Sequence, residues 1–219
     1  MDGIKNWLDF VGREKEDILA ATLAHARISL IVIVSATVFA VAFGIYIQRR
    51  PALRALGLTM AGIFLTIPSL ALFALFIPLV GIGNTPAMMA LFLYALLPIL
   101  RNTVTGLDEV SPAVVESARG MGMNQTQQLL RVRLPLAWPV IMTGVRVSSL
   151  LVISIAAIAV LVGGDGLGEY IQAGLTRLGL PFSVESVWVG TVFTVLLGLT
   201  FDLVFATIQR FTTPRGLRP

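Results

Sequence analysis

The sequence predicts an all-α integral membrane protein with about five transmembrane helices. Of its 219 residues, 56% are hydrophobic and only 13% are charged, which is more apolar surface than one soluble core of this length buries. The mean hydropathy of +0.88 agrees. Five apolar stretches are candidates to cross about 30 Å of hydrocarbon as helices of about 20 residues, the third of them only if it extends from its short apolar core to Val104. Lipid is therefore the expected solvent.

The predicted spans follow one another along the chain with short connections. They cover residues 28–47, 56–77, 86–100, 136–162 and 187–208. The second contains Pro68 and the third contains Pro98. We expect a kink at each, because a proline leaves one carbonyl without its intrahelical donor.

Residues 1–27 are predicted to form an N-terminal extracytoplasmic segment. They mix acidic and basic side chains, whereas an export signal has a basic patch followed by an apolar run. We therefore expect the segment to remain in the mature protein.

The placement of arginine predicts the orientation, because short loops rich in Lys and Arg stay in the cytoplasm. Three regions outside the predicted spans carry most of the arginines: 48–55, 101–135 and 209–219. The loop 80–85 has no charge, and the loop 163–186 has one base against three acids. The N-terminus is therefore expected outside and the C-terminus inside.

The cytoplasmic loop 108–135 contains sequence signals that start and end helices of its own. Ser111 can cap a helix that starts at Pro112, and Gly120 and Gly122 are expected to end it in a left-handed turn. A second short helix is predicted from residue 124 to 131, stopping before Pro135. The loop is thus expected to be a folded helix-turn-helix knob, a shape suited to a groove on a soluble partner.

The spacing in this loop resembles the EAA loop, E-A-A-x3-G-x9-I-x-L-P, of binding-protein-dependent ABC importer permeases. The residues that carry the resemblance, or lie within it, are Glu116, Ser117, Ala118, Gly120, Gly122, Val132, Leu134 and Pro135. Ser117 and Val132 depart conservatively from the motif. The resemblance implies that Glu116 and Ala118 lie on a helix that docks into a cleft of the ATP-binding subunit. Gly122 would form its turn.

The chain itself is predicted to carry no ATPase site. Its lysines are Lys5 and Lys15, and neither lies in G-x-x-x-x-G-K-[ST]. The glycine-rich run 163–168 has no lysine, so we interpret it as a bend. No cofactor is expected on this chain; ATP and Mg would be used by a separate ATPase subunit.

Further stretches resemble osmoprotectant permeases, which carry glycine betaine, carnitine, choline or related quaternary amines. They are residues 66–72, 91–103, 118–123 and 139–146. The resemblance implies a permease domain at 28–209 with the coupling loop 108–135, and a cytoplasmic tail at 210–219. Permeases for other small solutes such as methionine share the plan and remain an alternative.

The family implies a set of partners and a location. The partners are ABC ATP-binding subunits, an extracytoplasmic substrate-binding protein and a second permease subunit, identical or homologous. The expected location is the bacterial cytoplasmic (inner) membrane, as a multi-pass protein. A short outer helix over residues 169–178 would contact the binding protein.

Charged and hydroxyl side chains inside the spans suggest a translocation path or gate. Asp202 is the one acid within a predicted span. Placing an ionisable side chain inside a membrane costs free energy, so its presence there suggests a function. We hypothesise that Arg146 and Asp202 pair near the inner gate; the alternative is that each reaches the headgroups separately. Pro68, Ser69 and Ser149 are the other candidates for the path.

Several other classes of function find less support. The basic pI of 10.1 suits cytoplasmic arginines better than nucleic-acid binding. No metal site is predicted, because His25, the single histidine, has no second ligand nearby in sequence; we interpret it as interfacial. An ion-coupled secondary transporter would rest on Asp202 alone, and a passive channel would have no use for a docking loop.

Overall fold

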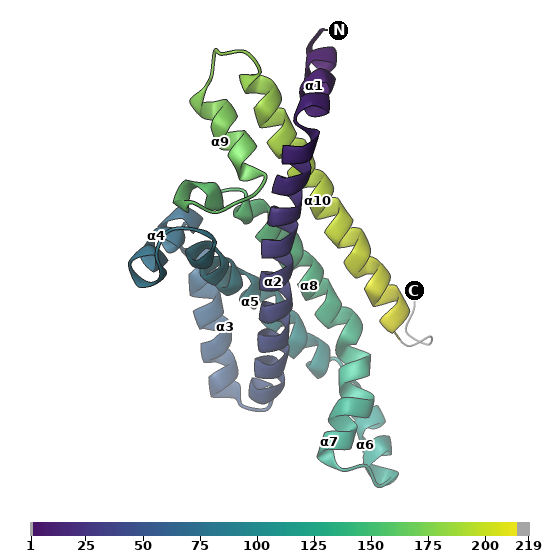
Figure 1. Ribbon diagram of the computed structural model, residues 1–219. Helices are drawn as coiled ribbons and strands as arrows, with labels where there is room; N and C mark the ends of the chain where they lie inside the picture. Colours follow the sequence, from purple (N-terminus) through teal and green to yellow (C-terminus); the bar gives the residue numbers. More distant parts are fainter. Residues whose placement is uncertain (1, 214–219) are drawn as a thin grey trace.

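The computed structural model describes residues 2–213, apart from the side chain of Asp2. Every regular element in that range is helical, in the following order (Figure 1): α1 (Asp2–Arg13), α2 (Lys15–Ile47), α3 (Pro51–Thr66), α4 (Ser69–Val80), α5 (Asn84–Asp108), α6 (Pro112–Gly120), α7 (Gln125–Gln128), the π-helical turn η1 (Leu129–Arg133), α8 (Leu134–Ala156), the 3-10 turn η2 (Ala159–Val162), α9 (Gly168–Thr176) and α10 (Ser183–Thr212). The predicted tail from 214 onward, with Arg215 and Arg218, lies outside the described residues.

The membrane-spanning plan is confirmed. Within residues 2–213, four helical stretches are long and apolar enough to cross a membrane: Lys15–Ile47, Asn84–Asp108, Gln125–Ala156 and Ser183–Thr212. A fifth is formed by α3 and α4 if that bent pair counts as one span. Each of the four starts before the predicted span, since a helix continues past the hydrocarbon into polar sequence.

The second predicted span, 56–77, is bent where a kink was expected, but far more sharply than a kink. The chain breaks between Thr66 and Ser69, and the helices on either side differ in direction by 101°. Ile67 has the extended backbone that a following proline imposes, with ψ of 131°. The hydroxyl of Tyr94 donates to the carbonyl of Ile67, which supplies a partner inside the protein. The expected kink at Pro68 is therefore a full corner, whereas α5 runs through Pro98 unbroken.

The fourth predicted span, 136–162, is wrong at both ends. The α-helix stops at Ala156 and the chain continues as a 3-10 turn. The start of α9 occupies the space beyond it, because a Cβ at Gly168 would lie only 1.9 Å from the carbonyl oxygen of Ala157. At the other end, helical structure continues from Gln125 to Ala156 without the predicted stop before Pro135.

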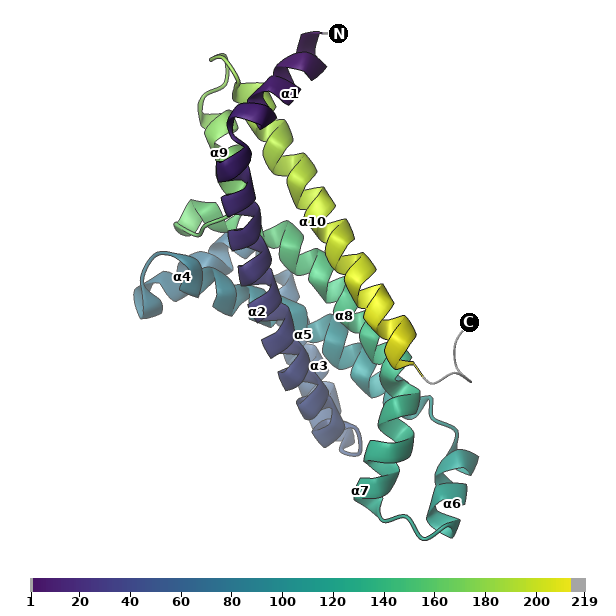
Figure 2. The ribbon, with the colours of Figure 1, turned by 45° about the vertical axis from the view of Figure 1, so that its right-hand side comes forward.

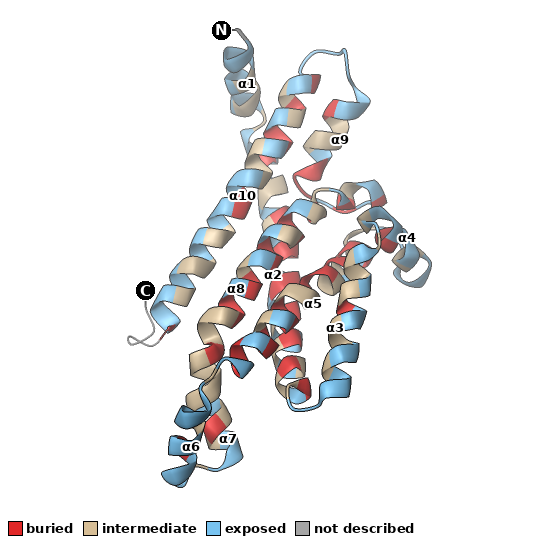
Figure 3. Ribbon diagram, turned by 180° about the vertical axis from the view of Figure 1, so that it is seen from behind, coloured by how far each residue is buried: buried red, intermediate tan, exposed pale blue. Residues whose placement is uncertain are grey.

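The core lies where α5 crosses α8 and α2, and Figure 3 shows the buried residues concentrated on these helices. Glycines make the crossing close. A Cβ on Gly144 would lie 2.7 Å from the carbonyl oxygen of Pro98, and one on Gly106 would lie 2.9 Å from that of Ala137. Small residues of this kind let membrane helices approach until their backbones pack. Ser148 adds a hydrogen bond of 2.9 Å from its hydroxyl to the carbonyl of Ala95.

His25 corrects a prediction. It lies inside α2 with 1% of its surface exposed, so it is not an interfacial side chain. Its Nε2 is 3.0 Å from the carbonyl oxygen of Ile153, near the end of α8. Gly166 packs against its ring. The histidine therefore joins α2, α8 and the glycine-rich run 163–168, which is a bend as predicted, with left-handed φ at Gly163 and Gly166.

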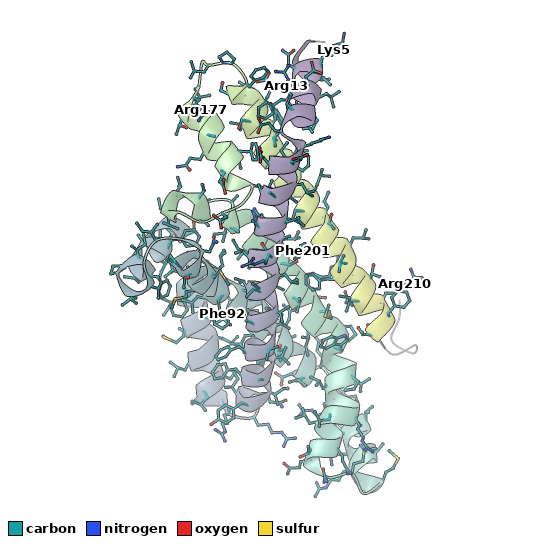
Figure 4. All side chains as sticks on the ribbon, viewed as in Figure 1. Lys5, Arg13, Phe92, Arg177, Phe201 and Arg210 are labelled. Carbon is teal, nitrogen blue, oxygen red and sulfur yellow. The ribbon has the colours of Figure 1, made fainter. Side chains whose placement is uncertain are left out.

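Four of the charged residues mark the two ends of the molecule. Figure 4 shows Lys5, Arg13 and Arg177 at the end where α1 and α9 lie, and Arg210 toward the other end of α10. Phe10 of α1 stacks on Phe182, before α10, with ring centroids 5.8 Å apart. These contacts hold α1 beside the start of α10.

Candidate functional site

The loop predicted to couple the chain to a partner protrudes from one end of the helical bundle. Figure 2 shows α6 and α7 side by side, beyond the ends of α2 and α3. The helical structure that begins with α7 continues through η1 into α8. A force on the loop therefore acts directly on a membrane-spanning helix.

Helix α6 begins and ends nearly as predicted. Pro112 is its first residue and Ser111 precedes it, although the Ser111 side chain makes no capping bond. At the other end the amide of Met123 donates to the carbonyl of Ala118, and that of Gly122 donates to Arg119. These two bonds form a Schellman motif with Gly122 in the left-handed position, at φ of 82°.

Of the two glycines predicted to make the turn, the structure assigns that role to Gly122 alone. Gly120 is the last residue of α6 and has ordinary helical backbone. A Cβ would have open space at either position. The two therefore differ only in backbone conformation, which makes them a matched pair.

We expect Gly122→Ala to loosen the turn, because a left-handed alanine costs about 1 kcal/mol. Amide exchange of residues 121–123 should rise about fivefold in the full-length protein, measured by hydrogen–deuterium exchange. Gly120→Ala should leave exchange unchanged or slow it. Equal rates in the two variants would show that the left-handed turn does not limit the stability of the loop.

The second helix of the loop is capped by a reciprocal pair. The amide of Gln127 donates to Oδ1 of Asn124, and the amide of Asn124 donates to Oε1 of Gln127, both at 2.9 Å. Gln128 is buried and donates to the carbonyl of Met123 at 2.7 Å. These bonds make the loop a self-supporting unit, as the helix-turn-helix prediction expected.

The predicted stop before Pro135 is wrong, and a π-helical turn lies just before that proline. In η1 the amide of Leu134 donates to the carbonyl of Leu129, five residues earlier. Proline within an α-helix collides with the carbonyl four residues before it. A turn widened to five residues changes the path of the backbone just before Pro135.

Some of the predicted coupling residues on α6 are buried and others are exposed to solvent. Ala118 is 1% exposed and packs inside the loop, while Glu116 is exposed. Ser117 is exposed too, but its hydroxyl donates to the carbonyl of Ala113 in its own helix. Leu134 and Pro135 form the first turn of α8. The geometry leaves Glu116 available to a partner and uses Ala118 to hold the helix in place.

Arg146 and Asp202 form the ion pair that the sequence analysis hypothesised. Nε of Arg146 is 2.8 Å from Oδ1 of Asp202, and Nη2 is 2.9 Å from Oδ2. This two-point geometry is the strong form of the interaction. Side-chain exposure is 35% for Arg146 and 30% for Asp202. The pair joins α8 to α10; a role in gating stays a prediction.

The structure does not bring the other path candidates to this pair. Pro68 and Ser69 lie at the corner between α3 and α4, which pack mainly on α5, whereas α10 packs mainly on α8 and α9. Ser149 is buried, and its hydroxyl donates to the carbonyl of Arg146 in its own helix. Their part in a translocation path also stays a prediction.

Sequence reasoning missed two further bonds between α8 and α10. Nε2 of Gln209 donates to the carbonyl of Pro139 at 2.9 Å, and Nε1 of Trp138 donates to the hydroxyl of Thr212 at 2.6 Å. The sequence gives no signal for the first bond, because a proline at 139 frees the carbonyl of residue 135 and not its own. Nothing in the sequence pattern pairs Trp138 with Thr212.

An acidic groove of about 580 Å³ lies between the junction of α1 and α2 and helix α9. Its acidic lining residues are Glu14, Asp17, Asp165 and Glu169. Burial raises the pKa of Tyr170 to about 12, and three of these carboxylates contribute to the shift. The Tyr170 hydroxyl therefore stays neutral at physiological pH. The groove lies beside α9. This helix, Gly168–Thr176, confirms the short helix that was predicted over residues 169–178.

A known protein family matches most of the chain. Residues 36–213 match the family "Binding-protein-dependent transport system inner membrane component". The match covers more than half of the chain and includes the loop from α6 to η1, the break between α3 and α4, and the ion pair.

Relatives of similar length support the match. The chain is 39% identical over 211 residues to the choline transport system permease protein OpuBB of Bacillus subtilis, covering 96% of this chain and 95% of that protein. It is 39% identical, with the same coverage, to the glycine betaine/carnitine/choline permease OpuCB of B. subtilis. It is 36% identical to the osmoprotectant import permease OsmW of Salmonella typhimurium, with full coverage of both chains.

The fold is also found among solved structures. A chain of the MetNI methionine ABC transporter, in an inward-facing conformation, superposes with a TM-score of 0.75. It covers 90% of this chain and 96% of that chain, at 23% sequence identity. At that identity the likeness concerns the fold alone.

Proposed function

The chain belongs to the family of binding-protein-dependent transport system inner membrane components, and from this premise we propose that it is the permease subunit of an ATP-driven osmoprotectant importer. The proposed solutes are glycine betaine, carnitine, choline or related quaternary amines. The observation that carries the proposal is the similarity over nearly the whole chain to permeases named for these solutes. The folded, protruding EAA-like loop supports the ATP-driven part.

We propose that ATP is hydrolysed by a separate subunit that receives the loop. The sequence supplies no P-loop lysine. The exposed Glu116 on a helix braced by Ala118 and Gly122 gives the partner a rigid surface. Closure of two such ATPases would then move α8 through the continuous helical connection, with ATP and Mg bound by the ATPases.

The different surfaces at the two ends of the helical bundle suggest where a substrate-binding protein and the cytoplasm lie. The arginine-rich end with the loop would face the cytoplasm of a bacterium, and the acidic groove beside α9 would face outward toward a substrate-binding protein. Helix α10 exposes a row of large apolar side chains: Val195, Leu196, Leu199 and Leu203. Lipid and a second permease subunit are the proposed neighbours of such surfaces.

One alternative solute class and one alternative mechanism remain for comparison. Methionine stays the second candidate solute, because permeases for other small solutes share the five-helix plan and the loop. Ion coupling through Asp202 is less well supported, because both of its carboxylate oxygens already bond to Arg146. That leaves no unpaired intramembrane acid to carry a proton at this position.

Uptake of labelled glycine betaine by cells that express the whole transport system tests the proposal. We expect saturable, ATP-dependent uptake with the intact chain. Glu116→Lys should reduce it at least about tenfold, because the charge reversal opposes docking. Glu109→Lys makes the same charge change at an exposed position before α6 and should leave uptake nearly unchanged.

The outcomes separate the parts of the proposal. Uptake of methionine but not of glycine betaine, carnitine or choline would overturn the solute class and keep the importer. Uptake that persists without ATP would overturn the importer itself. Both variants are compared at equal membrane levels.

A further inference from the structure

Arg133 occupies the junction between the protruding loop and the membrane helices. It is the last residue of η1 and directly precedes α8. We propose that Arg133 is a positioning residue that braces this junction, so that movement of the loop carries α2, α5 and α8 together as one body. The inference rests on the proposed function and adds the element that transmits its motion.

The guanidinium of Arg133 reaches the ends of two other helices. Its Nη2 donates to Oε1 of Gln48 at 2.8 Å and to the carbonyl oxygen of Leu107 at 3.1 Å. Gln48 is the C-terminal cap of α2, and Leu107 lies in the last turn of α5. Carbonyls of a last turn lack intrahelical donors, and a cation there is favourable to the helix dipole. The contact thus completes α5 while it joins three elements.

Burial makes these bonds stronger than those of a surface arginine. Arg133 is half-buried, and a charged donor in such a place forms bonds that are stronger than neutral ones. Nearby links are more exposed: Arg54 pairs with Asp108, and Arg49 donates to Gln125 at 3.4 Å. Exposed pairs of this kind contribute little. We therefore expect the hydrogen bonds of Arg133 to stabilise the junction more than the two exposed links do.

The π-helical turn explains why the junction needs a brace. Helices bend most readily at π turns and prolines, and here Pro135 lies two residues after the end of η1. Without a lateral tie, force on the loop would bend the helix at η1 instead of moving α8. Arg133 ties this point to α2 and α5.

Arg133→Met tests the inference, because methionine keeps an unbranched side chain but removes the charge and the donors. The complete transporter is assayed in proteoliposomes for uptake and ATP hydrolysis together. We expect uptake to fall about tenfold while hydrolysis stays within about twofold, since docking is kept and transmission is lost. Arg133→Lys, which keeps one cationic donor, should recover part of the uptake.

Arg131→Met is the matched control. Arg131 lies in the same π turn, is exposed, and its side chain makes no hydrogen bond among the described residues. It should keep the ratio of uptake to ATP hydrolysis of the unchanged protein, whatever its effect on docking. A parallel fall of uptake and hydrolysis in Arg133→Met would overturn the inference, because it would indicate lost docking or folding. Unchanged uptake would overturn it too.

A distance measurement keeps the inference separate from the proposed function. The chain has no cysteine, so spin labels at Ala52→Cys and Thr126→Cys report the separation of the α2–α3 connection from the loop. We expect a narrow distance distribution that broadens in Arg133→Met and stays narrow in Arg131→Met. An unchanged distribution in Arg133→Met would refute the brace whatever solute is carried, whereas absent uptake in the intact complex would count only against the proposed function.

Discussion

Replacing Arg146 by methionine is expected to lower the amount of folded protein in the membrane severalfold and to abolish transport by what remains. The change leaves the Asp202 carboxylate without either of its two bonds inside a span. Asp202 lies eight residues before Arg210, so it cannot easily reach the headgroups. An unpaired aspartate at such a depth costs about 2 kcal/mol, discounted for the partial exposure of the pair.

A double-mutant cycle identifies the pair as the cause. Arg146→Met with Asp202→Leu removes both charges, and we expect it to recover most of the folded protein. The charge-swapped double variant should recover part of it, because two-point geometry depends on which helix carries the guanidinium. Arg101→Met removes an exposed arginine from α5 and should have little effect. Equal membrane levels and melting temperatures in the single and double variants would contradict the pairing argument.

Gly144→Ala is expected to destabilise the close crossing of α5 and α8. The added carbon would lie 2.7 Å from the carbonyl oxygen of Pro98, 2.8 Å from Cβ of Asn102 and 3.1 Å from Cα of Ile99. Two of these atoms belong to the backbone of α5, so relief requires the helices to separate. We expect a loss of about 2–3 kcal/mol, seen as a lower melting temperature in detergent.

Gly62→Ala provides the control for that prediction. Gly62 lies within α3, and a Cβ there would have nothing within 4 Å. Alanine is the better helix former, so the melting temperature should stay the same or rise slightly. If Gly144→Ala melted like Gly62→Ala, the close crossing of α5 and α8 would not be a source of stability.

Local patterns were enough to predict the helical plan. Each span is a run of apolar residues, and a run is visible without knowing what it packs against. The boundaries were less accurate where a tertiary contact decided them. Pro68 is a kink by sequence, but the 101° corner depends on Tyr94 bonding the carbonyl that the break exposes. Pro135 was predicted to stop a helix, but the helical structure continues past it, as it does past Pro98 and Pro139.

The functional sites divide in the same way. The spacing from Glu116 to Pro135 is a sequence property, and the structure adds the Schellman turn at Gly122 and the burial of Ala118. The Arg146–Asp202 contact was a hypothesis until the rotation of α8 and α10 was known. Arg133 was counted only as one more cytoplasmic arginine, although it has the more specific set of partners.

The sequence by itself determined that this chain has helices long and apolar enough to span a membrane, and where its folded loop lies, because hydropathy and motif spacing are carried by neighbouring residues. The tertiary structure alone decided which distant residues meet. The three central polar contacts join residues 56, 85 and 26 positions apart: Arg146–Asp202, Arg133–Gln48 and Arg133–Leu107. Such contacts depend on helix rotation and crossing, which the packing of glycines and buried side chains sets and no local run of residues records.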